Sequence, residues 1–225
     1  GYQHTFTIAD SLPVGLTMEI FRDTSGFPAA DLNKASLYAG CKIMSATFGI
    51  TLEDLLRINI DVIGQQETQA AKSTPTYGTD ELAVFTQGSL KWGGNSIDVS
   101  DAEITINNNL EDDRRYIGAA TIKEPLPAEK ILVEGRFTAD FENYDMMNDF
   151  FNTTQRRLIL LFDGPVIAGT LKKSITFDVP VALIMDFDNA VDNHGRIRAD
   201  VSFQGYRDDT NNEVIVKIVN TASSV

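Results

Sequence analysis

The chain has 225 residues, and its 32 acidic residues against 19 basic ones give a net charge of −13 at pH 7. Such a surface repels the phosphates of nucleic acids and anionic lipids, which disfavours a module that binds either but not a passage through which DNA slides. Cys41 is the only cysteine, which excludes an intramolecular disulfide and an extracellular disulfide scaffold. The sequence has no apolar run of about 18 residues and no signal-peptide pattern at its start, so we expect a soluble protein made in the cytoplasm.

Segments rich in Val, Ile, Thr and Phe recur along the chain, as expected of half-buried strands. Pro180 lies inside one of them and indicates an edge strand or a bulge there, because proline cannot donate a ladder hydrogen bond. In chain order, strands are predicted over residues 14–21, 36–39, 42–50, 56–63, 97–99, 102–107, 130–142, 158–162, 174–185, 196–206 and 213–219.

Three of these segments alternate strictly between apolar and polar residues. In a strand, successive side chains point to opposite faces, so each segment has one buried and one wet face. The predicted core residues are Ile131, Val133, Phe137, Ala139 and Phe141 in the first segment, Ile197, Ala199, Val201 and Phe203 in the second, and Leu56, Ile58, Ile60 and Val62 in the third. Their charged opposite faces indicate a sheet that presents a broad polar surface.

Residues 143–151 are the best helix candidate. Asn143 is a suitable N-cap for the sequence YDMMNDFF. The apolar side of this helix is expected to carry Tyr144, Met147, Phe150 and Phe151. Many strands and one short helix predict a mainly β fold, a sandwich or partial barrel with the helix packed on it.

Two segments resist assignment to regular structure. Residues 64–96 are polar and interrupted by Gly, Pro and Ser, and residues 107–129 separate two clear strands. Loops longer than about 12–15 residues in a compact domain are usually functional or disordered. The second segment is too apolar for a disordered linker, so we expect another subunit to cover it. Its contact candidates are Leu110, Tyr116, Ile117, Ile122 and Leu126, together with the charged Arg114 and Arg115.

The sequence contains no recognisable catalytic arrangement. The histidines, His4 and His194, stand in different contexts, and His4 lies in what we expect to be a flexible N-terminus. The GxSxG, CxxC, HExxH and P-loop patterns are absent. We therefore predict no enzyme activity and no cofactor.

Residues 186–195, DFDNAVDNHG, form a weak candidate for a metal-binding loop. Asp186, Asp188 and Asp192 supply the oxygen ligands that Ca²⁺ favours, but their spacing is not that of an EF-hand. A hairpin turn before the next strand is the simpler interpretation. We predict no metal ion here.

The segment 97–142 resembles the tail tube proteins of long-tailed, siphovirus-like bacteriophages. The likeness is carried by IDVSDAEITINNNLEDD, by the Ile117–Gly118 step, and by ILVEGRFTADFENYDMMNDFF with Gly135 inside its long strand. The earlier segment GCKIMSATFGITLEDLLRINIDVIGQ resembles the first strand pair of the same family.

The resemblance implies a single β domain over residues 1–225 whose sheet closes across subunits in hexameric rings. Stacked rings would form a virion tail tube, synthesised in the host cytoplasm, through which DNA passes without specific binding. Expected partners are further copies of the chain, the tape measure protein, and the tail terminator and distal tail proteins. Candidates for the acidic lumen are Asp61, Glu134, Asp140, Glu142 and Asp200. The arginines on the same strand faces, Arg57, Arg136, Arg196 and Arg198, are expected to pair with carboxylates or to face subunit contacts.

Two other functions stay open at this point. A monomeric ligand- or carbohydrate-binding sandwich would need a concave aromatic surface, for which Trp92, Tyr77 and Tyr116 are the available residues. A hydrolase would need a carboxylate pair, and no spacing in the sequence supports one.

Overall fold

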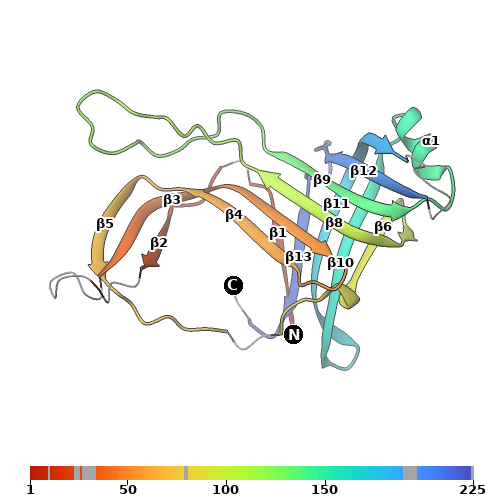
Figure 1. Cartoon of the computed structure of the whole chain (residues 1–225), viewed down its shortest axis with the longest axis horizontal. Helices are drawn as coiled ribbons and strands as arrows, with labels where there is room; N and C mark the ends of the chain where they lie inside the picture. Colours follow the sequence, from red (N-terminus) through yellow and green to blue (C-terminus); the bar gives the residue numbers. More distant parts are fainter. Residues whose placement is uncertain (10, 23–25, 27–33, 79–80, 190–196, 224–225) are drawn as a thin grey trace.

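The computed structural model describes residues 1–9, 11–22, 26, 34–78, 81–189 and 197–223. It confirms a mainly β fold with one short α-helix among these residues (Figure 1). No described helix is long and apolar enough to cross a membrane. The strands are β1 (Tyr2–Thr7), β2 (Leu16–Phe21), β3 (Lys34–Thr51), β4 (Arg57–Ile63), β5 (Gln66–Ala71), β6 (Gly88–Trp92), β7 (Asn95–Ile97), β8 (Val99–Asn107), β9 (Leu132–Asp140), β10 (Arg156–Ala168), β11 (Leu171–Asp188), β12 (Arg198–Gly205) and β13 (Ile215–Asn220), and the helix is α1 (Asp145–Phe151).

The strands form one antiparallel sheet that folds into two layers. Its order is β2-β3-β8-β9-β12-β11-β10-β6-β7, with β4 and β5 added on β3 and with β13, which carries β1, added on β11. In Figure 1 the strands β3, β4, β8 and β9 run across those of the β10–β11–β13 layer. Aromatic pairs join the layers: the ring centroids lie 4.6 Å apart for Phe48–Phe177 and 6.4 Å apart for Trp92–Phe137.

The core follows the alternation of the long strands. The apolar faces of β9 and β12 are buried as predicted at Val133, Phe137, Ala139, Ala199, Val201 and Phe203. Ile131, Phe141 and Ile197 lie just outside the strand ends and are only partly buried. The predicted segments 130–142 and 196–206 were therefore slightly too long.

Strand β11 belongs to both layers. It pairs with β13 as far as Asp178 and with β12 from Ala182 onward. Pro180 lies in this gap, beside a register shift in the pairing with β10. The predicted bulge is confirmed, and the missing proline N–H falls where β11 changes partner.

Strand β3 carries a small projecting sheet. Residues 36–39 and 42–50, predicted as separate strands, belong to one strand that bends at Gly40, which has a left-handed φ of 64°. Before the bend β3 pairs with β2 and β5, and after it with β4 and β8. We call the unit of β2, β5 and the first half of β3 the flap; it extends away from the sandwich (Figure 1).

Three regions differ from the sequence-based expectation. The N-terminus is not a free end, because His4 lies in β1 and its Nε2 is 3.2 Å from Asn220 Oδ1. Residues 64–96 contain β5, β6 and most of β7. The strand β5 is polar on both faces and therefore has no alternation to detect, whereas Leu90 and Trp92 of β6 do alternate with polar residues and are buried.

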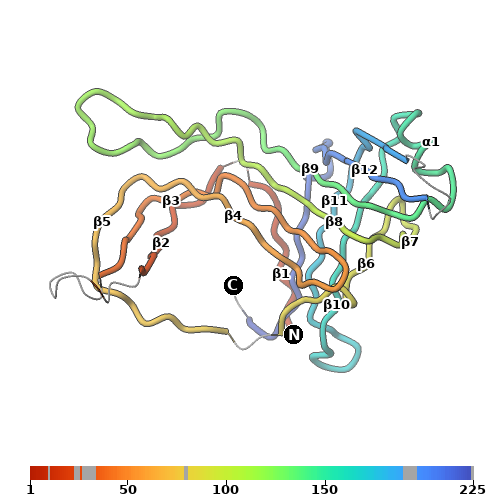
Figure 2. Tube along the Cα trace, in the orientation of Figure 1, coloured from red at the N-terminus to blue at the C-terminus, as the bar shows by residue number. Residues whose placement is uncertain are grey.

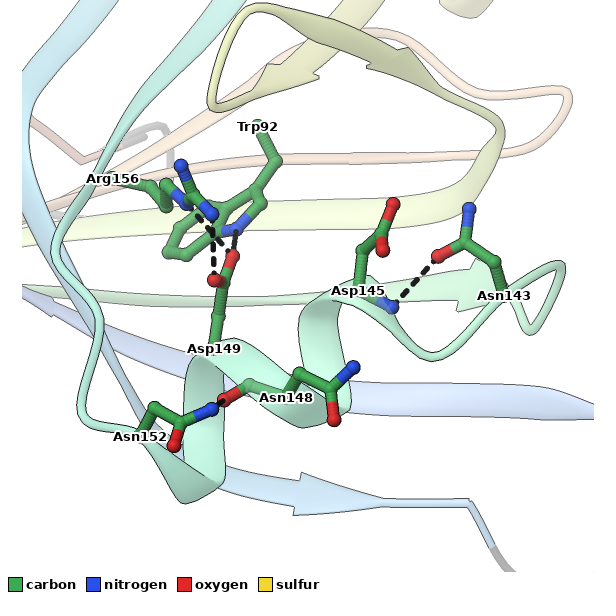
Figure 3. A network of polar contacts seen from close by, with 7 residues as sticks. All are labelled: Trp92, Asn143, Asp145, Asn148, Asp149, Asn152 and Arg156. Carbon is green, nitrogen blue, oxygen red and sulfur yellow. Dashed lines mark hydrogen bonds and ion pairs between the residues drawn. The ribbon is translucent and has the colours of Figure 1, made fainter.

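The helix α1 buries only part of the predicted face: Phe150 is partly buried against the core. Asn143 Oδ1 accepts the Asp145 N–H at 2.9 Å, as expected of a capping side chain. Tyr144 and Phe151 are exposed, however, and Met146 and Asp149 are the buried residues. The Asp149 carboxylate explains this orientation: it accepts the Trp92 Nε1–H at 3.0 Å and a bidentate pair of bonds from Arg156 (Figure 3). The helix is thereby fixed to β6 and β10.

A second buried carboxylate joins β10, β11 and β13. Asp178 is only 2% exposed and accepts bonds of 2.7 and 2.6 Å from Arg157 and one of 3.3 Å from Lys217. Burial raises the pKa of Asp178, but the hydrogen bonds and charges of Arg157 and Lys217 outweigh it, so the pKa lies below its ordinary value.

Truncation of Phe137 tests the assignment of the core. The Phe137→Ala variant should lose on the order of 3–5 kcal/mol of unfolding free energy, because the fully buried ring leaves a cavity. Phe141→Ala, at a partly buried site, serves as the matched control and should lose less. Both are measured by urea denaturation, and equal losses would show that the burial of β9 is assigned wrongly.

Replacement of Asp178 should give a pH-dependent loss of stability. A lowered folded-state pKa stabilises the protein above the unfolded pKa of about 3.9, and this contribution disappears as the pH falls through the folded value. Asp178→Asn should therefore cost about 1–3 kcal/mol at pH 7 and progressively less below about pH 4. Asp163→Asn, at an exposed pair with Lys172, is the control and should change stability little at either pH.

Candidate functional site

The outer face of one layer is a continuous polar surface. Residues paired directly across an antiparallel sheet share a face, so the registers of β4, β3, β8, β9 and β12 define it. One row runs from Asp61 through Ser45 and Asn107, and the next rows run through Thr105, Glu134 and Gln204 and through Asp101, Thr138 and Asp200. We call this surface the polar face. It confirms that the three alternating strands lie in one layer and turn their charged sides the same way.

Short cross-strand hydrogen bonds order the polar face. Ser45 donates to Asp61 at 2.7 Å, and Thr138 donates to Asp200 at 2.6 Å. The hydroxyls of Thr47 and Thr105 lie 2.9 Å apart. Because these side chains bridge neighbouring strands, the carboxylates are held in fixed rows and not on freely moving stems.

Carboxylates outnumber cations on the polar face. Arg136 lies 3.6 Å from Glu103, and Arg57 donates bonds of 2.8 and 3.0 Å to Asp54, whose pKa is lowered by that contact and by the Leu55 N–H. Both arginines are thus paired with carboxylates, as predicted; Arg196 lies outside the described residues. The acidic members are Asp61, Asp101, Glu103, Glu134, Asp140 and Asp200, and the basic ones are Arg57, Arg136 and Arg198.

Glu142 is the lumen candidate that the structure places elsewhere. It follows the end of β9 and lies beside Asn143 and Asp145 at the start of α1. The prediction extended β9 by two residues, which kept Glu142 in the alternation. Asp61, Glu134, Asp140 and Asp200 do share the polar face.

The described part of the candidate metal loop, residues 186–189, is largely strand. Asp186 and Asp188 lie on β11, opposite Ser202 and Asp200, and so belong to the same layer. Asp192 and His194 lie outside the described residues. Among the described residues, no group of three or more His, Cys, Asp or Glu side chains is arranged to hold a metal ion.

The inner, apolar face of the sheet is uncovered along one margin. Phe48 of β3 pairs with Ile58 of β4 and packs on Phe177 of the opposite layer. Phe177 pairs in turn with Val216, and Val216 pairs with Phe6 of β1, so these residues form one row. At the two ends of this row, Ile58 is 52% and Phe6 43% exposed. The prediction that Ile58 and Ile60 are buried was wrong, because no strand of the opposite layer covers β4. Both β4 and β1 pair on one side only among the described strands.

Residues 108–131, the loop between β8 and β9, form an extended hairpin that we call the arm (Figures 1 and 2). Glu111 N–H donates to Leu126 O, Lys123 N–H to Arg114 O, and Ala128 N–H to Asn109 O. The arm thus satisfies part of its own backbone while it projects from the sandwich.

The predicted contact residues of the arm fall into two groups. Leu110 is buried at the root, where it bridges to Pro127, and Arg114 donates to the Glu124 carbonyl. Ile117, by contrast, is 108% exposed, and Tyr116 and Leu126 are also exposed. An ion pair of 2.7 Å between the buried Lys42 of β3 and Glu124 ties the arm to the strand from which the flap projects. The exposed apolar tip is therefore presented on a fixed stem.

The aromatic residues do not form a binding surface. Trp92 is buried and donates to Asp149 (Figure 3), whereas Tyr77 and Tyr116 are exposed on separate segments. The ligand-binding alternative therefore lacks the exposed tryptophan that its aromatic surface would need.

The family model described as phage tail tube protein matches residues 4–205. The chain belongs to this family. It is accordingly a structural component of a phage virion tail that assembles with copies of itself and with other tail components. A comparison with individually curated proteins finds no match.

Two substitutions in the arm of this tail tube protein test its part in assembly. Ile117→Asp with Ile122→Asp should leave a folded protein that does not polymerise, because carboxylates would have to be buried at the contact. Circular dichroism checks the fold and sedimentation velocity the assembly. Val166→Asp, at an exposed apolar position on β10, is the control; normal tubes from the arm variant would remove the arm from the contact.

Proposed function

We propose that this tail tube protein forms hexameric rings that stack into the tube of a phage tail, and that DNA passes through a lumen lined by the polar face. The whole chain, residues 1–225, acts as one unit without catalytic activity. It is made in the host cytoplasm before it enters the virion.

The observation that carries this proposal is the contrast between the two sides of the sheet. Its outer face is polar and ordered by hydrogen bonds, whereas its inner, apolar face is exposed along one margin. The polar face is regular and ordered by hydrogen bonds, as a surface facing water should be. At the open margin between the two layers, apolar side chains of β4 and of β1 are exposed beside strand edges that have no neighbour among the described strands. Such edges are an aggregation liability unless another chain pairs with or covers them. A ring in which each copy covers the margin of the next resolves both problems.

The charge of the polar face suits a conduit. DNA would be held by fixed cations, since each neutralised phosphate adds binding energy through counterion release. The arginines on this face are fewer than the carboxylates, and Arg57 and Arg136 are paired with them. A lining of this kind lets a polyanion slide. The tape measure protein would occupy the same lumen before DNA, and the terminator and distal tail proteins would contact the two tube ends.

The oligomer itself is the first test. Purified protein, concentrated stepwise, should pass from monomers to rings and tubes in sedimentation velocity, and negative-stain end views should show six-fold symmetry. A protein that stays monomeric at every concentration would favour the binding-module alternative. Rings of another order would correct the stoichiometry only.

Charge reversal tests the lumen assignment. Glu134→Lys with Asp200→Lys should leave tube assembly intact, because both side chains are exposed, and should make the tubes retain short duplex DNA in a salt-dependent manner. The control, Glu142→Lys with Asp209→Lys, changes the net charge equally at exposed positions off the polar face. Equal DNA retention by both variants would show that the polar face does not line the lumen.

A further inference from the structure

A cleft of about 830 Å³ lies at the root of the arm. Its walls come from the segment after β1, from both ends of the arm, and from the turn between β12 and β13. The larger apolar residues of its lining are Ile8, Leu12, Pro127, Ile131 and Leu132. Its size is typical of a specific binding cleft, into which several side chains fit.

The turn that forms one wall is rigid. Asp208 accepts hydrogen bonds from the backbone N–H groups of Thr210 and Asn211 at 2.8 and 2.7 Å, and from the Asn211 side chain. These bonds fix the turn before β13, so Glu213 enters the cleft wall from a fixed backbone.

Glu213 is incompletely satisfied in the single chain. Its Oε2 is shielded from solvent and has no hydrogen-bond partner among the described residues. Lys130 and Arg207 also border the cleft, but neither reaches this oxygen. A carboxylate oxygen that loses water without gaining a donor costs free energy. The Glu213 side chain as a whole is only partly buried, so a rotation that turns this oxygen toward the cleft would let a positively charged donor from outside bond it and recover that free energy. The cleft therefore fits a cationic side chain next to apolar ones.

The tip of the arm carries a cationic side chain next to apolar ones. Arg115 is exposed next to Tyr116 and the fully exposed Ile117. A turn presents them: the Ala119 N–H donates to Tyr116 O at 3.1 Å, and Gly118 has a left-handed φ of 88°. An arginine suits a carboxylate better than a lysine here, because its planar guanidinium forms two parallel bonds and tolerates apolar neighbours.

An arm cannot fill the cleft at its own root. The backbone bonds between Glu111 and Leu126 and between Lys123 and Arg114 keep the hairpin extended, and the tip lies far from the root in Figure 2. The occupant must come from a second copy. We propose that residues Arg115–Ile117 of one copy enter the root cleft of another, with the Arg115 guanidinium paired to the Glu213 carboxylate. This inference rests on the proposed assembly and names the receptor for the arm within it.

Because tip and cleft are different surfaces, the contact is heterologous and leaves a free tip and a free cleft at the ends of any row of copies. Contacts of this type propagate until they close into a ring or extend as a filament. The same pair therefore serves whether it joins neighbours within a ring or copies in successive rings.

The charge pair is tested by an isosteric substitution. Glu213→Gln should leave the melting temperature of the monomer unchanged or higher, since it removes an unsatisfied charge, and should raise the critical concentration for assembly by about tenfold or more. Glu142→Gln, at an exposed residue outside the cleft, is the control and should assemble normally. Arg115→Glu with Glu213→Arg should assemble better than either single reversal. Normal assembly of Glu213→Gln, or failure of the double reversal to exceed the single ones, overturns the pairing.

Cross-linking tests the location independently of charge. Cys41, the native cysteine, is buried, so a disulfide that forms under mild oxidation is expected to join the introduced cysteines. A mixture of Ile117→Cys and Leu12→Cys proteins, assembled and mildly oxidised, should give a covalent dimer, and a mixture of Ile117→Cys and Val166→Cys should not. Tubes that form without the first dimer would overturn the cleft assignment and leave the proposed function standing. A wild-type protein that never forms tubes or rings would overturn both.

Discussion

The change of partner along β11 is the constraint on which the rest of the molecule depends. One strand pairs with β13 in its first half and with β12 in its second, with Pro180 and a register shift between them. Because a sheet buries one face, a strand that crosses from layer to layer turns the apolar sides of both layers toward each other. The packing of Phe48 on Phe177 and of Trp92 on Phe137 follows from that fold-over.

The two layers do not match in width, and this mismatch leaves apolar surface exposed. The β3–β8–β9–β12 layer continues into β4 and the flap, beyond the strands that could cover it. Its outer side carries ordered rows of polar residues, whereas the isoleucines at the margin of its inner side are exposed. A monomer built in this way has surplus apolar surface and unpaired strand edges, both of which association can remove.

Buried ionic contacts hold the helix, the strands and the arm in position relative to one another. Asp149 holds α1 through Trp92 and Arg156, Asp178 joins three strands, and Lys42 ties the arm to β3. Each carboxylate or ammonium is surrounded by donors or acceptors of the chain itself. The Glu213 oxygen differs because it has no hydrogen-bond partner among the described residues, which is why we assign it to a contact between copies and not to a structural role.

Alternation in the sequence by itself determined the faces of the long strands. The period of two identifies Phe137, Val201 and their neighbours as core and Glu134 and Asp200 as surface, since these assignments need only the local geometry of a strand. The missing N–H of proline located the bulge at Pro180, and the capping side chain of Asn143 located the start of α1. Alternation could not show which strands the opposite layer covers. Ile58 alternates as regularly as Val201, and its exposure depends on where the opposite layer ends. Only the tertiary structure decided this, along with the burial of Trp92, the inward face of α1 and the approach of Ile8 and Leu12 to the cleft that Glu213 lines, because each depends on packing between segments distant in sequence.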